Sequence, residues 1–409
     1  MQAEIIAIGD ELTSGQRVDT NSAWLSQRLG ELGIRVAYHT TAADDLTACS
    51  TVFLTALARA ELVLCTGGLG PTADDLTRQA LADAVQKSLV LDEDALAHII
   101  TLFQRYGREM PERNRVQAMF PEGSRVIPNP HGTAPGVDFT QSFEGGRTSR
   151  VMALPGVPAE MKEMWEQTVR SEIASMVGVQ RVIRHRSLKC FGIGESDLEQ
   201  RLPDLIRRGR EPTVGITVHR ATITLRITSD GVSEAHCHRA MQPTIDTIHE
   251  CLGELVFGEE SDELQDAIAA QLVAGSKTLA TGEIGTRGLI ARWMGATSLA
   301  TDCFRGGAVT LDEARLVEVV GAELLAGATV AQRHEALADA IRRGYGADYG
   351  LVVGAFPDEA NEDAHYYIGL ATADERSSHR ARYTGHPDIL EERSAKQALN
   401  YLRLRLLNG

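Results

Sequence analysis

The sequence lacks the signals that mark several specialised classes of protein. Its six cysteines lie far apart and include no Cys-x-x-Cys pair, so neither a disulfide framework nor a zinc site is predicted. No run of about 18 apolar residues occurs, and the N-terminal residues combine no basic segment with a long apolar one. We therefore expect a soluble, cytoplasmic protein with no membrane partner.

Basic residues are also in short supply. Lysine and arginine number 41 against 56 aspartates and glutamates, which gives a formal net charge of −15. Nucleic acids and anionic membranes require a basic face, so we expect neither as a partner. Any phosphate site must be made locally, from backbone amides, a few arginines or a metal ion. The length of 409 residues predicts two or three domains.

The most informative stretch is LVLCTGGLGPTADD, residues 62–75. Its first four residues form a continuous apolar run, which predicts a buried parallel strand. The glycines that follow place no side chain between the backbone and a ligand, so successive N–H groups can approach phosphate oxygens. Pro71 cannot donate a hydrogen bond, whereas Thr72 can. The stretch therefore predicts a phosphate-binding loop.

Asp74 and Asp75 follow this loop, where the helical pattern LTRQALADAV begins. Acidic residues at a helix start are favoured by the helix dipole, by about 0.3–1 kcal/mol each, and that alone could explain them. A diphosphate on the glycines also needs a divalent cation, which carboxylate oxygens beside the loop can hold. Strand, GGxGxT and paired aspartates together favour the second interpretation.

The first third of the chain alternates strands and helices. Apolar runs predict strands at 3–8, 34–39 and 62–65, and amphipathic patterns predict helices at 22–33 and 47–60. This order is typical of a doubly wound parallel α/β sheet, whose ligands bind outside the carboxyl ends of the strands.

Acidic pairs follow two of these strands. Asp10-Glu11 and Asp44-Asp45 are each more typical of a solvated turn or a helix cap when taken alone. Together with the glycine loop they are expected to face one crevice, which favours a metal and phosphate site. Asn114 is expected on a helical turn near that crevice, where it could offer a donor to an anion or lie on a solvated face. Asn21, beside the start of a predicted helix, is a further candidate.

The rest of the chain forms two smaller units. Residues 173–258 show strand, helix, two strands and helix, which predicts a small α+β domain with an antiparallel sheet and no evident chemistry. Residues 259–409 predict an α/β unit, with a strand near 277–280 followed by a glycine-containing turn. The first unit is assigned to residues 1–172.

Six motifs identify a resemblance that covers essentially the whole chain. They are VDTNSAWLSQRLGELG, TGGLGPTADDLT, RNRVQAMFPEG, NPHGTAPG, LPGVPAEM and GIGESDLEQRL, in that order. The chain resembles the competence/damage-inducible CinA family, whose first domain is similar to molybdopterin-binding (MoCF) domains. The resemblance implies a metal-dependent ADP-ribose pyrophosphatase in the first domain, a nicotinamide-nucleotide amidohydrolase in the last, and a homodimer.

The resemblance also implies roles for individual residues. It makes Asp44 and Asp75 the catalytic and metal-binding residues, without deciding which grips metal and which acts on water. The metal would be Mg²⁺, Mn²⁺ or Co²⁺, with K⁺ as a further candidate ion, and the substrate a small nucleotide. The substrate-binding residues are expected to be Gly67, Gly68, Gly70, Pro71, Thr72, Asp10, Glu11, Asn21 and Asn114.

The C-terminal domain departs from the family pattern. Active members read Glu-Ser-Cys-Thr-Gly-Gly where this chain reads EIGTRG from Glu283, so Ile284 replaces the nucleophilic serine. Arg315 stands where an activating lysine is expected, and arginine is a poor base because it stays protonated. The glycine-rich loop expected after Gly354 reads AFPD. Thr286 or Thr310 is an alternative nucleophile, but neither has an evident base. We therefore expect no deamidation of nicotinamide mononucleotide (NMN).

These observations lead to one functional expectation and two alternatives. We expect a hydrolase of ADP-ribose or a related nucleotide diphosphate, with a degenerate amidohydrolase domain at the C-terminus. The first alternative is a scaffold that binds a nucleotide or pterin phosphate without turnover. The second is chemistry on molybdopterin, which ranks last because relatives of that kind usually act with partner domains that this chain lacks.

Overall fold

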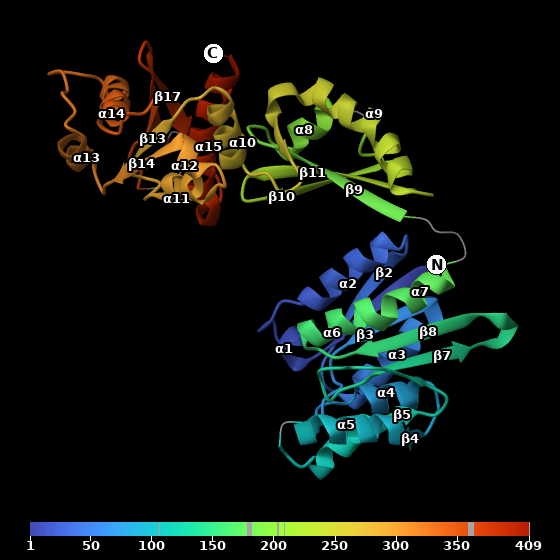
Figure 1. Cartoon of the computed structure of the whole chain (residues 1–409). Helices are drawn as coiled ribbons and strands as arrows, with labels where there is room; N and C mark the ends of the chain where they lie inside the picture. Colours follow the sequence, from blue (N-terminus) through green and yellow to red (C-terminus); the bar gives the residue numbers. More distant parts are fainter. Residues whose placement is uncertain (106, 178–181, 203, 208, 359–363, 409) are drawn as a thin grey trace. The chain divides into compact units, whose positions relative to one another are not determined.

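The computed structural model describes residues 1–105, 107–177, 182–202, 204–207, 209–358 and 364–408. Contacts divide the chain into two compact units (Figure 1). Unit 1 comprises Met1–Arg184 with Asp230–Arg239, and unit 2 comprises His185–Ser229 with Ala240–Gly409. None of the described helices combines the length and apolar character needed to cross a bilayer.

Unit 1 is built on a six-stranded sheet in the order β2-β1-β3-β8-β7-β6. The strands are β1 (Gln2–Ile8), β2 (Arg35–Ala42), β3 (Leu62–Thr66), β6 (Arg125–Ile127), β7 (Gly136–Ser142) and β8 (Thr148–Leu154). β2, β1, β3 and β8 are parallel, whereas β7 and β6 pair antiparallel at one edge. The expected doubly wound α/β fold is confirmed, with an antiparallel extension that the sequence did not predict.

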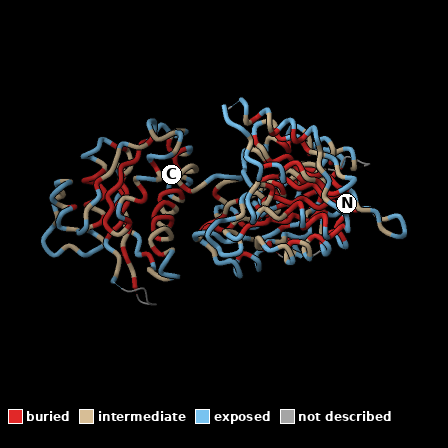
Figure 2. Tube along the Cα trace, turned by 90° about the horizontal axis from the view of Figure 1, so that it is seen from below, coloured by how far each residue is buried: buried red, intermediate tan, exposed pale blue. Residues whose placement is uncertain are grey.

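Helices cover both faces of this sheet. They are α1 (Asp10–Thr13), α2 (Thr20–Glu31), α3 (Leu46–Arg59), α4 (Thr77–Ala84), α5 (Glu93–Arg105), α6 (Pro158–Met164) and α7 (Arg170–Met176). Along β3, Leu62 and Leu64 pack in the core with α2, α6 and α7, whereas Val63 and Cys65 pack in the core with α3 and α4. Figure 2 shows the buried residues gathered along the strands. A short two-stranded antiparallel sheet of β4 (Leu89–Leu91) and β5 (Met119–Pro121) adjoins α4.

The middle domain has the expected α+β order. Its strands are β9 (Val182–Cys190), β10 (Thr213–His219), β11 (Thr222–Gly231) and β12 (Val256–Glu259), and its helices are α8 (Glu195–Arg201) and α9 (Glu234–Leu252). The sheet order β10-β11-β9-β12 is that of a split β-α-β arrangement.

The C-terminal domain is a mixed five-stranded sheet in the order β14-β13-β15-β16-β17. Its strands are β13 (Leu279–Glu283), β14 (Phe304–Val309), β15 (Tyr349–Val353), β16 (His365–Ala371) and β17 (Arg376–Arg382). Its helices are α10 (Leu264–Ala274), α11 (Leu289–Ala296), α12 (Ala300–Cys303), α13 (Glu313–Val320), α14 (Val330–Gly344) and α15 (Pro387–Asn408). The strand expected near 277–280 begins two residues later, because Thr278 instead bonds the side chain of Asp348.

Helix α15 joins the middle domain to the C-terminal domain within unit 2. The Nζ atom of Lys396, whose side chain is only 7% exposed, donates to Thr222 Oγ1 at 2.6 Å and to Glu263 Oε2 at 3.3 Å. Arg403, also buried, donates to the carbonyl oxygen of Glu254 at 2.5 Å. Buried cations that find such partners hold the two domains in one arrangement.

We expect Lys396→Met to lower the free energy of unfolding by about 1–3 kcal/mol, because it removes a buried donor to Thr222 and Glu263. The matched control is Lys277→Met, which breaks a half-exposed pair with Asp348 at 3.7 Å and should cost no more than about 0.5 kcal/mol. Urea unfolding followed by circular dichroism measures both. Equal losses would show that Lys396 contributes no more than a surface lysine.

Candidate functional site

The carboxyl ends of four parallel strands meet at one edge of the unit 1 sheet. Ile8 at the end of β1 is paired with Ala42 at the end of β2, and Thr66 at the end of β3 with Leu154 at the end of β8. The amide of Gly9 donates to the carbonyl oxygen of Ala42 at 3.0 Å, so the first two loops leave the sheet together. The loops after β1, β2, β3 and β8 therefore open at the same place.

Carboxylates gather at this edge, and we call Asp10, Glu11, Asp44 and Asp74 the acidic rim. Asp10 and Asp44 exchange hydrogen bonds, from Asp10 N to Asp44 Oδ2 at 2.9 Å and from Asp44 N to Asp10 Oδ1 at 3.1 Å. Burial raises the pKa of Asp44, and the charges of Asp10, Asp74 and Glu11 raise it further, against the Asp10 amide, which lowers it. Asp45 faces elsewhere and caps α3 through the amide of Ala48.

The glycine loop depends on backbone conformations and clearances that only glycine provides. Gly67 has φ +106°, and a Cβ atom there would lie 2.2 Å from the carbonyl oxygen of Ile8. Gly68 has φ +64°, and its Cβ would lie 2.4 Å from Thr77 Oγ1. Thr77 in turn donates from that hydroxyl to the carbonyl oxygen of Gly67 at 2.7 Å. The loop is thus clamped between the end of β1 and the start of α4.

Several of the loop amides already make hydrogen bonds within the protein. Gly67 N donates to the carbonyl oxygen of Leu154 at 3.1 Å, and Gly70 N donates to Asp75 Oδ1 at 2.7 Å. The Thr72 amide also donates to Asp75, at 2.9 Å. Within the described residues, the amides of Gly68 and Leu69 make no hydrogen bond, and Leu69 is only 1% exposed. The amide of Gly68 is therefore the unbonded one that is accessible, and substrate binding by the loop stays a prediction.

Asp75 holds the loop in shape. Its carboxylate accepts hydrogen bonds from the Gly70 amide and from both the amide and the hydroxyl of Thr72. A Cβ atom at Gly70 would lie 2.3 Å from Asp75 Oδ2, so the two residues are in close contact. These contacts give Asp75 a positioning role, and metal binding by Asp75 stays a prediction.

Arg78 is a residue at this site that the sequence reasoning missed. It is 3% exposed, and its guanidinium donates to the carbonyl oxygens of Leu69 at 2.8 Å and Pro135 at 3.0 Å. Burial lowers its pKa to about 10, whereas the charge of Asp75 raises it. A cation in the first turn of a helix interacts unfavourably with the helix dipole. This unfavourable placement is the feature of the sequence that could have identified Arg78.

The two candidate asparagines support the loop from behind. The side-chain amide of Asn21 donates to Thr66 Oγ1 at 3.0 Å and to the carbonyl oxygen of Gly156 at 2.9 Å. Asn114 is buried and donates to Gln117 Oε1 at 2.8 Å. Gln117 then reaches the carbonyl oxygen of Leu69 at 3.4 Å. The hydrogen bonds of both asparagines are therefore structural, and their binding of substrate stays a prediction.

In the C-terminal domain, Glu283 caps a helix. It is fully buried at the end of β13, and its carboxylate accepts from the amides of Ile290 at 3.0 Å and Ala291 at 2.7 Å at the start of α11. The hydroxyl of Thr286, also fully buried, donates to Glu283 at 2.7 Å. A hydroxyl that donates to a buried carboxylate beneath a helix is poorly placed to attack a substrate. Ile284 beside it is 4% exposed.

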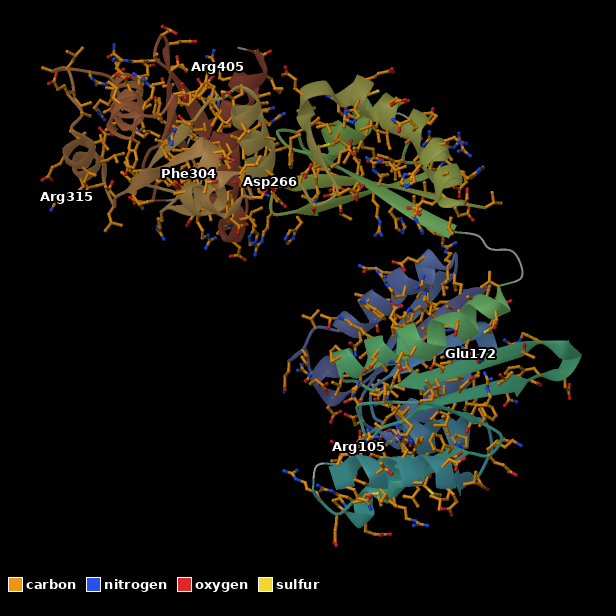
Figure 3. The ribbon with its side chains drawn as sticks, viewed as in Figure 1. Arg105, Glu172, Asp266, Phe304, Arg315 and Arg405 are labelled. Carbon is orange, nitrogen blue, oxygen red and sulfur yellow. The ribbon has the colours of Figure 1, made fainter. Side chains whose placement is uncertain are left out.

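Aromatic packing occupies the space next to this turn. Ring carbons of Phe356 lie 2.5–2.7 Å from where a Cβ of Gly285 would be, and the ring stacks on Tyr383 at 4.8 Å between centroids. Arg315 lies on α13 with its side chain 67% exposed and paired with Glu318 (Figure 3). Its guanidinium therefore makes its described contact on the surface, with a residue of its own helix.

Family models cover the chain in three segments. The model described as "Probable molybdopterin binding domain" matches residues 4–175. The damage-inducible protein CinA KH domain matches residues 185–258, and the CinA C-terminal domain matches residues 261–406. A molybdopterin-binding-like α/β unit followed by these two domains defines the class of protein.

Relatives extend the match over the full length. A competence-damage inducible relative from Bacillus velezensis is 33% identical over 100% of this chain and 98% of its own. Another, from a Geobacillus strain, is 34% identical over 99% of both chains. A solved structure of a CinA protein from Thermoplasma acidophilum is 35% identical and covers 42% of this chain and 96% of that one, with a TM-score of 0.38. The chain belongs to the competence-damage inducible (CinA) protein family.

Gly67→Ala should lower the free energy of unfolding by about 2–5 kcal/mol, because it combines an unfavourable positive φ with a backbone clash at Ile8. Gly15→Ala is the control: φ is +74° there, but nothing lies within 4 Å of the added Cβ atom, so only about 1–2 kcal/mol is expected. Urea unfolding compares the two. If both variants lost the same free energy of unfolding, the close approach of Gly67 to β1 would add nothing to the cost of the positive φ angle.

Proposed function

We propose that unit 1 hydrolyses ADP-ribose or a related nucleotide diphosphate in a metal-dependent reaction. The observation that carries this proposal is the meeting, at one sheet edge, of an accessible, unbonded backbone N–H group and the acidic rim. Amides of this kind suit phosphate oxygens, and carboxylates suit the divalent cation that accompanies a diphosphate. The family membership is compatible with this chemistry, and the activity itself is our proposal.

The side chains at the acidic rim fit a divalent cation in part. Burial, and to a smaller extent repulsion from Asp10, Asp74 and Glu11, raises the pKa of Asp44, and a bound cation would relieve that repulsion. Within the described residues, no group of three or more His, Cys, Asp or Glu side chains is placed to hold a metal ion. Mg²⁺ usually takes one or two carboxylates together with substrate phosphates and water. We therefore propose that Asp44 and Asp10 supply the protein ligands.

The proposed reaction adds water across the diphosphate. The oxygen of water forms a bond to one phosphorus, the bridging P–O bond breaks, and AMP and ribose 5-phosphate leave. Gly68 would hold a phosphate oxygen through its amide, and the buried cation of Arg78 behind the loop would favour its charge. When bound, the metal ion would neutralise phosphate charge and lower the pKa of water. Asp44 acts in its ionised form.

Asp44→Asn should lower kcat/KM for ADP-ribose by about 100-fold or more, measured with Mg²⁺, Mn²⁺ or Co²⁺. It should not lower stability at pH 7. The folded-state pKa of Asp44 is raised, so ionisation costs stability as pH rises through it, and asparagine removes that cost. Asp83→Asn on α4 is the matched control and should retain activity. Unchanged kcat/KM in Asp44→Asn would remove Asp44 from the proposal.

The pH dependence gives a second test of the acidic rim. Because Asp44 must be ionised, kcat/KM should fall as pH drops through its raised pKa. Asp74→Asn removes one of the charges that raise this pKa, so the acid limb of the profile should move to lower pH. The profile of kcat/KM against pH for both proteins measures the shift. If the acid limb did not move, the charge of Asp74 would not contribute to the pKa of Asp44.

A second candidate function is binding without turnover. It is favoured by the full use of the Asp75 carboxylate inside the loop. Two results together would favour a nucleotide- or pterin-binding scaffold over the hydrolase. Calorimetry would show binding of ADP-ribose, and no phosphate-ester product would form with any of the three metals.

We further propose that the C-terminal domain does not deamidate NMN and serves a structural or dimerising role. The burial of Thr286 against Glu283 and the packing of Phe356 against Gly285 support this. The purified protein should release no ammonia from NMN in a coupled assay. Ile284→Ser alone should not create activity, because Arg315 offers no base. Ammonia release by the unmodified chain would refute the proposal.

A further inference from the structure

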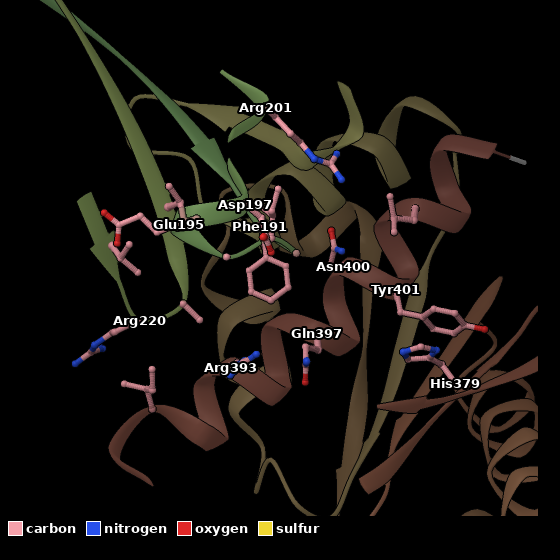
Figure 4. A pocket seen from close by; sticks show the side chains of 18 of the residues that line it. Phe191, Glu195, Asp197, Arg201, Arg220, His379, Arg393, Gln397, Asn400 and Tyr401 are labelled. Carbon is pink, nitrogen blue, oxygen red and sulfur yellow. The ribbon is translucent and has the colours of Figure 1, made fainter. Parts of the chain in front are cut away.

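Unit 2 contains a cleft of about 1210 Å³ that no step above uses (Figure 4). One side is the segment from Phe191 into α8, the second is the turn between β10 and β11 around Arg220, and the third is one face of α15. The volume exceeds the roughly 300–1,000 Å³ of common small-molecule sites, so it can admit a ligand of mononucleotide size.

The α15 face presents two side-chain amides, one of which is oriented by its partner. Asn400 Oδ1 accepts from Arg403 Nε at 3.0 Å and from its Nη2 atom at 2.9 Å. Because a guanidinium can only donate, the NH₂ group of Asn400 is the part of this side chain left for a ligand. The hydroxyl of Tyr366 lies 2.8 Å from Gln397 Oε1 and 3.0 Å from the carbonyl oxygen of Ser394, and its one hydrogen serves only one of them. The cleft therefore has a fixed neutral donor at Asn400 and a second amide, Gln397, one helical turn away.

Guanidinium groups from three elements add positive charge to the lining. Arg393 on α15 donates from one nitrogen to the carbonyl oxygen of Thr384 at 2.6 Å, and its other N–H groups are left for a ligand. Arg220 is paired with Glu392 at 3.0 Å. Within the described residues, Arg201 on α8 has no hydrogen bond or ion pair. Glu195 and Asp197 are the carboxylates of the lining. Since Arg220 is paired, the two other guanidinium groups and the two carboxylates balance in charge, and the cleft offers both donors and acceptors.

We propose that this cleft binds a hydroxylated organic phosphate, either a sugar phosphate or a mononucleotide. Arg201, Arg393 and the amides of Gln397 and Asn400 bind the phosphate oxygens as charge-assisted and neutral donors. The carboxylates of Glu195 and Asp197 accept hydrogen bonds from ligand hydroxyls, which a bare phosphate lacks. This site lies in unit 2 and is separate from the glycine loop of unit 1. It makes unit 2 a ligand-binding unit, whatever the activity of unit 1.

The test is calorimetry on the full chain with ribose 5-phosphate and AMP, and with ribose and adenosine as phosphate-free controls. Gln397→Glu and Asn400→Asp keep the oxygen that Tyr366 or Arg403 needs and replace the NH₂ donor by a charged oxygen. Each should weaken binding of both phosphates at least tenfold without lowering the urea midpoint. Gln141→Glu makes the same charge change in unit 1 and should leave binding unchanged.

The outcomes separate this site from that of unit 1. Tighter binding of AMP than of ribose 5-phosphate identifies a mononucleotide, and equal binding identifies a sugar phosphate; both support the proposal. Absence of binding by either phosphate at millimolar concentration would overturn it, as would equal binding of ribose or adenosine. So would a loss of binding in Asp44→Asn with none in Gln397→Glu and Asn400→Asp, since that result places the ligand in unit 1.

Discussion

The architecture of unit 1 depends on a close approach between Gly67 and the end of β1. A Cβ atom at Gly67 would lie 2.2 Å from the carbonyl oxygen of Ile8, so any larger residue would push the loop from the strand that leads into Asp10. The acidic rim and the loop amides could not then share one edge of the sheet. Thr77 reinforces the approach through its bond to the Gly67 carbonyl oxygen. The carboxylates of the proposed chemistry thus depend on a backbone contact for their place beside the loop.

Sequence patterns predicted the layers of unit 1 because its central strands β1, β3 and β8 are buried on both faces. The continuous apolar run of β3 reflects burial on both faces of the sheet. The glycines after it reflect a loop whose backbone leaves no room for a side chain. The orientation of Asp75 could not be predicted, because a carboxylate at a helix start can cap the helix, bind a metal ion or turn back toward the preceding loop. Here it turns back, because the amides of Gly70 and Thr72 lie within hydrogen-bond distance only in the folded chain. Arg78 was not predicted for a similar reason. Its partners are the carbonyl oxygens of Leu69 and Pro135, and Pro135 is far away in sequence.

The C-terminal domain shows where patterns of hydrophobicity fail. β17 is an edge strand with the sequence RSSHRAR, in which only Ala381 is buried, so it has no apolar alternation to detect. Helix α15 begins at Pro387, seven residues before the helical pattern SAKQALNYLRLRLL, because proline is compatible with a first helical turn. The substitution of Ile284 for a nucleophile was readable from the sequence, whereas the packing of Phe356 against Gly285 required the fold.

Helix α15 also explains why polar residues can be so frequent in a helix that is partly buried. Lys396 and Arg403 donate to oxygens of the middle domain, and Asn400 accepts from Arg403 through its side-chain oxygen. Burying a cation without such partners would cost several kcal/mol, so the helix can dock only where Thr222 and Glu254 supply acceptors. The bond from Arg403 also leaves the NH₂ group of Asn400 to donate in the cleft. An interface built to satisfy buried cations therefore also sets the orientation of a donor in the cleft.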